Sequence, residues 1–351
     1  MNWSDNLFVP LHHWATRQDE NFTTEVFVYL LKYLQVNEKA SFHRFASNLS
    51  RNLLETISDG NHEIAITTQV RNNSTIQDIQ LKTSDKLVFV EVKVGSPLER
   101  KQVEAYLNFL KQASYKSENT LLVCLTRSPI SSETTDGAYP IRWYQVARWL
   151  EQEAELVESG TCKFLISNFI EFLVYQKATL TKVSSPISAG ISKYRNQAGE
   201  NSISHKRFKS LEKLLAVDEL RPLHDFMLLI FESLKSFTDE KKIRFDSSND
   251  ISGDGVVMFN IDNGQYFIWV EYDYPEVLRL STYKRVADQS EDNLKFGRIV
   301  YEKKYKGFRW RNDVALPEDF INLDRQKQLN SLSKIVSENL NFAKSVTYLQ
   351  D

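Results

Sequence analysis

The segment Ile76–Gly95, IQDIQLKTSDKLVFVEVKVG, constrains the fold more than any other part of this chain. Two runs of strand-forming residues flank a polar Lys-Thr-Ser-Asp-Lys segment, a pattern that predicts two antiparallel strands joined by a turn at Ser84 and Asp85. Pairing outward from this turn sets Leu81 opposite Val88. The same register extends along both strands, so it fixes which side chains share a face.

This register predicts one apolar face and one functional face. Alternate positions on the two strands form an unbroken apolar stripe suited to packing under helices: Ile79, Leu81, Val88, Val90, Val92 and Val94. The opposite face carries Asp78, Glu91 and Lys93, with Asp78 expected directly across from Glu91. Directly opposed residues have Cβ atoms about 5 Å apart, and two carboxylates at such positions repel each other unless a cation lies between them. A divalent metal ion is the expected cation.

The length of 351 residues predicts two domains. We expect a first domain over residues 1–182, a linker over 183–201 and a second domain over 202–351. The order helix, three-strand meander, helix, strand in the first part predicts an α/β core with a mixed central sheet flanked by helices. Short alternating segments grouped between helices predict a smaller α+β accessory domain in the second part.

The composition excludes several classes of protein. The chain has no apolar run approaching the ~20 residues of a membrane span and begins without a signal-like segment, so we expect a cytoplasmic protein with no membrane partner. Cys124 and Cys162 are too few for a disulfide framework. A net charge of −2 gives no global sign of a polyanion partner. No glycine-rich phosphate loop indicates nucleotide-driven work.

The Asp78 strand, followed by Glu91-Val92-Lys93 at the end of the next strand and then by a helix, resembles the PD-(D/E)xK nuclease superfamily. This resemblance implies a restriction-endonuclease-like core. Gln77 stands where the family name expects proline. The motif is short, and its alternative reading is a solvated polar face of a strand.

Two helices extend the resemblance, which covers Asp19–Tyr144. The segment DENFTTEVFVYLL looks like the first core helix of these enzymes, with its acid at Glu25. Glu25 is expected on the apolar side of that helix, three residues after Phe22. Gln102 and Tyr106 resemble the Q-x-x-x-Y helix of one large branch. Glu25 as an ion-paired core acid and Gln102 as a satisfied core amide remain the alternatives.

Asp78 on the first strand of the hairpin and Glu91-Val92-Lys93 on the second can be assigned chemical roles. Phosphodiester hydrolysis needs charge neutralisation and a hydroxide near pH 7, both of which an oxygen-ligated divalent ion supplies. We expect Asp78, Glu91 and the backbone carbonyl near Val92 to hold Mg²⁺ or Mn²⁺. Lys93 is expected to hold or deprotonate the attacking water, helped by a pKa lowered by the metal.

The resemblance implies further roles and partners. Glu25 would bind a second metal or orient water, and Gln102 would position Lys93 or the phosphate. The products would carry 5′-phosphate and 3′-hydroxyl ends. DNA is favoured over RNA as substrate, a homodimer is a common state, and defence against foreign DNA is a plausible setting. The alternative is a catalytically retired nuclease core that binds or senses nucleic acid.

Basic residues interleaved with aromatic ones suggest a nucleic-acid surface in the second domain. The segment RIVYEKKYKGFRWR, residues 298–311, could neutralise phosphates while its rings stack on unpaired bases. A second basic patch follows the linker. The candidate nucleic-acid-binding residues are Lys303, Lys304, Lys306, Arg309, Arg311, Lys206 and Arg207. The alternatives are a hairpin whose aromatic residues point inward and the polar face of a helix start.

Overall fold

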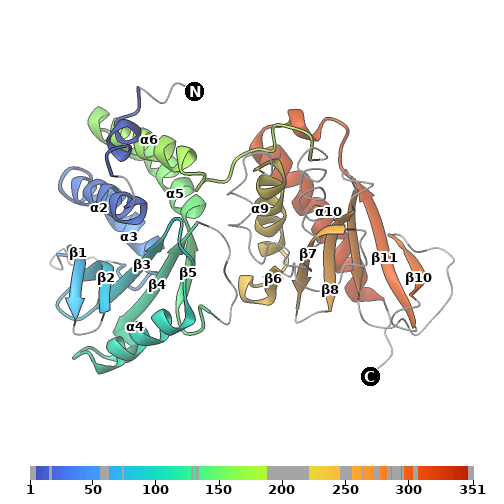
Figure 1. Ribbon diagram of the computed structural model, residues 1–351, viewed down its shortest axis with the longest axis horizontal. Helices are drawn as coiled ribbons and strands as arrows, with labels where there is room; N and C mark the ends of the chain where they lie inside the picture. The colour runs from blue at the N-terminus through green and yellow to red at the C-terminus, as the bar shows by residue number, and fades with distance from the viewer. Residues whose placement is uncertain are drawn as a thin grey trace. The chain divides into compact units, whose positions relative to one another are not determined.

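A computed structural model gives the structure of the chain (Figure 1). The chain divides into two compact units, Met1–Thr179 and Leu180–Asp351. Within the described residues, no helix combines the length and apolarity needed to cross a membrane. The structure describes residues 5–15, 18–55, 63–72, 75–127, 130, 134–187, 221–245, 255–262, 265–271, 277–282, 286, 294, 296–302 and 307–346.

A five-stranded mixed sheet forms the centre of the first unit. Its strands are β1 (Ala65–Asn72), β2 (Thr75–Lys82), β3 (Leu87–Lys93), β4 (Thr120–Thr126) and β5 (Tyr139–Arg142). They lie in sequence order, with β1, β2 and β3 antiparallel and β3, β4 and β5 parallel. The predicted three-strand meander leading into a mixed sheet is therefore confirmed.

The predicted register of the β2–β3 hairpin is also confirmed. Leu81 pairs with Val88 and Ile79 pairs with Val90. At the turn, the Thr83 N–H donates to the Lys86 carbonyl at 2.9 Å. The ladder ends at the Ile79–Val90 pair, so Asp78 and Glu91 lie just beyond it.

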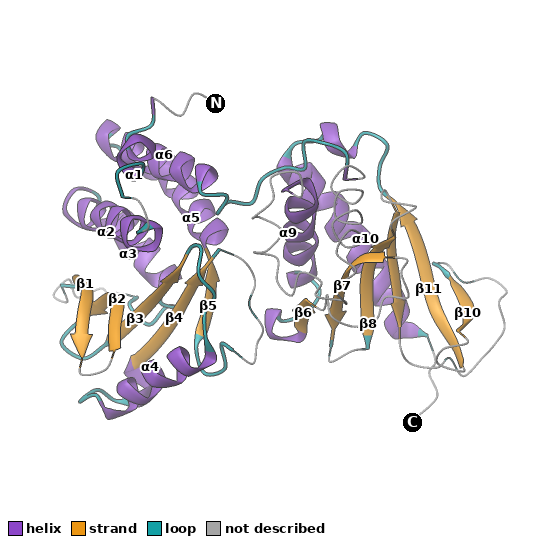
Figure 2. Cartoon of the chain, in the orientation of Figure 1, coloured by secondary structure: helices purple, strands orange, loops and turns teal. Residues whose placement is uncertain are grey.

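Helices cover both faces of this sheet (Figure 2). The helices of the unit are α1 (Phe8–His12), α2 (Asp19–Asn37), α3 (Lys39–Leu49), α4 (Arg100–Gln112), α5 (Trp143–Leu156) and α6 (Gly160–Tyr175), with a short 3-10 turn η2 (Ser117–Asn119). The apolar stripe of the hairpin joins one core with residues of α2, α3, α5 and α6. Helix α4 packs on the other face, where Phe89 stacks on Phe109 at 5.6 Å between ring centroids.

The prediction that Glu25 lies on the buried face of its helix is wrong. Helix α2 buries Phe27, Leu31 and Leu34, whereas Glu25 is exposed and Tyr29 is 55 % exposed. The run VFVYLLKYL is apolar on more than one side, so its periodicity does not identify a single face. The contact with α6, where Phe27 stacks on Phe169 at 5.7 Å between ring centroids, selects the buried side.

The second unit is an antiparallel sheet with helices. Its elements are α9 (Arg221–Lys235), η4 (Glu240–Lys242), β6 (Ile243–Phe245), β7 (Gly255–Ile261), β8 (Tyr266–Glu271), β9 (Val277–Thr282), β10 (Arg298–Glu302), β11 (Gly307–Ala315), η6 (Phe320–Asn322) and α10 (Arg325–Ser345). The strand order is β10-β11-β9-β8-β7-β6, and every described pairing is antiparallel. Helix α10 packs against α9, β9 and β11. The predicted group of strands between helices is therefore confirmed for the described residues of this unit.

Buried Gln328 ties the first residues after the unit boundary into the second unit. Its amide oxygen accepts the Val183 N–H at 2.9 Å, and its amide nitrogen donates to the carbonyls of Val183 and Phe320, each at 2.8 Å. Val183, the first residue of the expected linker, thus belongs to the packed part of this unit. The expected linker residues from 188 onward lie outside the described residues.

Candidate functional site

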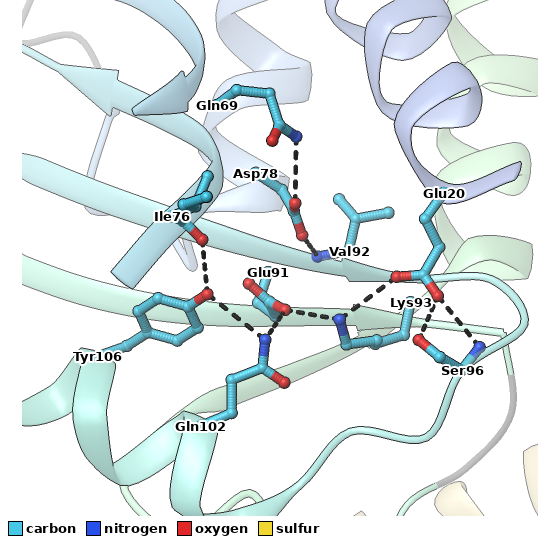
Figure 3. A network of polar contacts seen from close by, with 10 residues as sticks. All are labelled: Glu20, Gln69, Ile76, Asp78, Glu91, Val92, Lys93, Ser96, Gln102 and Tyr106. Atoms are coloured by element: carbon cyan, nitrogen blue, oxygen red, sulfur yellow. Dashed lines mark hydrogen bonds and ion pairs between the residues drawn. The ribbon is translucent and has the colours of Figure 1, made fainter. Parts of the chain in front are cut away.

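Asp78 leaves the β2–β3 ladder and replaces a backbone hydrogen bond with one from its side chain (Figure 3). Its Oδ2 accepts the Val92 N–H at 2.8 Å. Beyond the Ile79–Val90 pair, the carboxylate of Asp78 therefore satisfies a donor of β3. This contact fixes the distance between Asp78 and the end of β3, where Glu91 and Lys93 lie.

Gln69 holds the other oxygen of the same carboxylate. Its amide nitrogen donates to Asp78 Oδ1 at 3.3 Å. The Thr68–Ile79 and Val70–Gln77 pairs on either side set Gln69 opposite Asp78. Gln69 has φ of 50°, a left-handed conformation that costs a residue with a Cβ roughly 1–2 kcal/mol. The role of Gln69 could not be predicted from the sequence, because glutamine carries no signal for positive φ.

Glu91 and Lys93 form a buried ion pair at the end of β3. Lys93 Nζ lies 2.8 Å from Glu91 Oε1, and the Glu91 side chain is 2 % exposed. Both residues point to the face of the sheet that α4 covers, because Phe89 on the same side packs in the α4 core. The structure therefore brings Asp78, Glu91 and Lys93 together, as the sequence predicted.

Glu20, rather than Glu25, is the acid that α2 contributes to this cluster. Glu20 Oε2 lies 3.3 Å from Lys93 Nζ, and Glu20 Oε1 accepts the Ser96 N–H at 3.1 Å and the Ser96 hydroxyl (Figure 3). Five residues of α-helix separate two side chains by about 140° around the axis, so Glu20 and Glu25 cannot share a face. Helix periodicity alone gave no signal for Glu20, because it lies in the first turn, before the apolar run.

Helix α4 contributes an amide and a hydroxyl. The Gln102 amide nitrogen donates to Glu91 Oε1 and lies 3.4 Å from the Tyr106 hydroxyl. The Tyr106 hydroxyl donates to the Ile76 carbonyl at 2.7 Å, which ties α4 to the start of β2. Gln102 thus contacts Glu91 directly, whereas the sequence predicted that it positions Lys93 or a phosphate.

Burial raises the pKa of both carboxyl groups. Burial, and then the negative charge of Asp78, raise the pKa of Glu91 to about 7, although Lys93 opposes the change by its charge and its hydrogen bond. Burial also raises the pKa of Asp78, against the hydrogen bond from Val92 and the charge of Lys93. Glu91 is therefore poised to exchange a proton for a cation near neutral pH.

The neighbouring acids keep Lys93 charged. Burial lowers its pKa, but the charge and the hydrogen bond of Glu91, then the charges of Glu20 and Asp78, outweigh burial and raise the pKa above its usual value. In this arrangement Lys93 is a cation that two carboxylates hold, which suits electrostatic stabilisation better than proton abstraction.

The fit to a divalent ion can be judged from the donors present. Within the described residues, no three His, Cys, Asp or Glu side chains gather into a metal-binding group. Two acids nevertheless converge, and Glu91 Oε2 is buried without a hydrogen-bond partner among those residues. Mg²⁺ needs only one or two carboxylates when waters and phosphate oxygens complete its shell. Asp78 and Glu91 therefore fit Mg²⁺ or Mn²⁺.

The comparisons with known proteins add no further evidence. No protein-family model, no curated protein and no solved structure matched this chain. Functional interpretation therefore depends on the contacts, burial and charges of the site.

The two described candidate residues for nucleic-acid binding, Arg309 and Arg311, form contacts with other residues of the second unit. Arg309 is 6 % exposed and donates to the Thr282 carbonyl at 3.5 Å, so the prediction of a free phosphate-binding side chain is wrong for Arg309. Arg311 lies 3.1 Å from Asp313. Trp310 is fully buried, whereas Tyr301 is 52 % exposed. Lys303, Lys304, Lys306, Lys206 and Arg207 lie outside the described residues.

Proposed function

We propose that the chain is a metal-dependent nuclease that hydrolyses phosphodiester bonds and that its first unit is a restriction-endonuclease-like core. The observation that carries this proposal is the convergence of Asp78, Glu91 and Lys93 at one end of a mixed sheet, with Glu91 Oε2 buried and without a partner among the described residues. Lys93 is the counter-charge that the described contacts give to these acids, and a buried carboxylate oxygen without a hydrogen-bond partner is costly, so such a cluster favours a site that takes a further cation.

Asp78 and Glu91 would hold Mg²⁺ or Mn²⁺, with the carbonyl of Val92 as a further ligand. A bound divalent ion supplies Lewis acidity toward the phosphate and lowers the pKa of a bound water. Asp78 is already oriented by the Val92 N–H, and Glu91 by Lys93 and Gln102. The side chains would therefore need little rearrangement on binding, which lowers the cost of forming the site.

Lys93 would act as a fixed positive charge beside the scissile phosphate. The acids around it raise its pKa, so it would hold the attacking water and stabilise developing negative charge while it keeps its own proton. Gln102 would orient Glu91 and would not touch the reacting atoms. Glu20 would hold Lys93 and the Ser96 backbone in place.

The resemblance to the nuclease superfamily gives the substrate and setting of this proposal. DNA is favoured over RNA, the products would carry 5′-phosphate and 3′-hydroxyl ends, and defence against foreign DNA is a suitable role. A homodimer would supply a second site for cleavage of both strands.

A retired nuclease core that binds nucleic acid is the second candidate. The ion pair between Lys93 and Glu91 favours it, as does the absence of a metal-binding group of three His, Cys, Asp or Glu side chains among the described residues. Intact Asp78, Glu91 and Lys93 argue for retained catalysis.

A cleavage assay separates the two candidates. End-labelled DNA and RNA are incubated with the full chain in Mg²⁺ or in EDTA, and Glu91→Gln is compared with Glu25→Gln, a matched change at an exposed acid of α2. We expect Mg²⁺-dependent cleavage that Glu91→Gln abolishes and Glu25→Gln preserves. Binding of DNA without cleavage by any variant would support the retired core instead.

A further inference from the structure

Gln69 has a backbone conformation that the course of its strand does not require. Four other described non-glycine residues have positive φ: Arg51, Asn52, Lys177 and Asp262. Arg51 and Asn52 follow the end of α3, Lys177 follows the end of α6, and Asp262 follows the end of β7. Ends of elements commonly use this conformation to stop or turn the chain. Gln69 instead lies inside β1.

The pairing of β1 with β2 keeps one register across Gln69. The Thr68–Ile79 and Val70–Gln77 pairs flank Gln69 without a shift in register, so neither strand has a β-bulge at this position. The left-handed conformation of Gln69 directs its side chain toward Asp78, where the amide nitrogen donates a hydrogen bond to Oδ1 (Figure 3). An unfavourable conformation kept in the middle of a strand indicates a function that depends on this contact.

We propose that Gln69 is a positioning residue that fixes the Asp78 carboxylate for a divalent cation. This inference rests on the proposed function and adds a residue outside the recognised motif. Gln69 and the Val92 N–H each hold one oxygen of Asp78. Each carboxylate oxygen has two lone pairs, so both oxygens keep one for a metal ion while the orientation of the group is set.

The contact predicts that metal affinity and stability respond in opposite directions to one substitution. Gln69→Gly removes the amide and relieves the left-handed backbone, because glycine has no Cβ. We expect the Kd for Mn²⁺ to rise about 10–100-fold, the usual effect of losing a group that orients a ligand, while Tm rises by about 2–4 °C. Gln69→Ala removes the amide and keeps the strained backbone, so the same rise in Kd should come without a gain in Tm.

Calorimetric titration of Mn²⁺ into the full chain, with thermal melting of the metal-free protein, tests the proposal. Lys177→Gly is the matched control, since it relieves the same conformation at the end of α6 and should raise Tm with an unchanged Kd. An unchanged Kd in both Gln69 variants, with normal Mn²⁺ binding by the wild type, would overturn this inference and leave the proposed function standing. Failure of the wild type to bind Mn²⁺ would overturn both.

Discussion

Lys93 Nζ lies 2.8 Å from Glu91 Oε1 in a site where neither side chain is more than 11 % exposed. A buried ion pair offsets the cost of taking each charge out of water, so the two residues depend on each other. Asp78 adds a second negative charge to the same site, and Glu20 adds a third at 3.3 Å from Lys93. Lys93 is therefore the counter-charge for an acidic cluster.

Replacing Lys93 by methionine should destabilise the protein more at high pH than at low pH. Without the ammonium group, two of the effects that lower the pKa of Glu91 are lost, the charge and the hydrogen bond of Lys93, so Glu91 ionises at a greater cost. Removing one partner of a buried pair costs about 3–5 kcal/mol when the other stays charged. We expect that loss in urea unfolding at pH 8 and a smaller loss at pH 5.5, where Glu91 takes up a proton. Lys101→Met, at an exposed position of α4, is the control. An equal loss at both pH values would contradict the prediction.

Glu91→Gln should remove a pH dependence from the stability of the metal-free protein. The pKa of Glu91 is about 7 in the folded state and 4.5 ordinarily, so the folded state binds more protons and stability falls as pH rises through this window. A shift of this size corresponds to roughly 3 kcal/mol. We expect the free energy of unfolding, measured in EDTA from pH 4.5 to 8, to decline with pH in the wild type and to decline much less in Glu91→Gln. Identical slopes would show that another group carries the dependence.

The same substitution at two positions of α2 should have different effects. Glu20→Gln weakens the contacts with Lys93 and with the Ser96 N–H and hydroxyl, and hydrogen bonds to charged groups contribute about 1.5–3 kcal/mol. Glu25 is exposed, and a change there should stay within about 0.5 kcal/mol. Chemical unfolding of the two variants measures the difference. A larger loss of stability in Glu25→Gln would contradict the assignment of Glu20, rather than Glu25, as the acid that α2 contributes to the site.

The β10–β11 hairpin allows a test of nucleic-acid binding by the second unit. Tyr301 is 52 % exposed and can stack on a base, and its loss should weaken single-stranded DNA binding by about 1–3 kcal/mol if the hairpin is used. Trp310 is fully buried, so Trp310→Ala should instead destabilise the fold by about 3–5 kcal/mol. Fluorescence anisotropy with labelled DNA and urea unfolding separate the two effects. Unchanged affinity in Tyr301→Ala would exclude stacking at this position.

The sequence predicted those features that depend on short-range alternation. The β2–β3 register follows from the turn at Ser84 and Asp85 because a slip of one residue would move every apolar side chain to the wrong face. The same pattern predicted the strands of the second unit. There β10 pairs with β11 and Trp310 is fully buried, which agrees with the alternative of a hairpin whose aromatic residues point inward, whereas Tyr301 is exposed.

Features set by tertiary packing could not be predicted. The choice between Glu20 and Glu25 depends on which side of α2 meets α6, and α2 is apolar on several sides. The role of Gln69 depends on a positive φ that its residue type does not signal. Val183 joins the second unit through Gln328, 145 residues later, a distance that no local pattern spans.

Diffraction from crystals soaked in Mn²⁺ would show whether Asp78 and Glu91 share a cation, because anomalous scattering locates the ion without any assay of activity. We expect a peak within about 2.5 Å of carboxylate oxygens from both Asp78 and Glu91, and its loss in Glu91→Gln. A peak elsewhere, or no peak at a saturating concentration near pH 8, would contradict a shared cation site at these two acids.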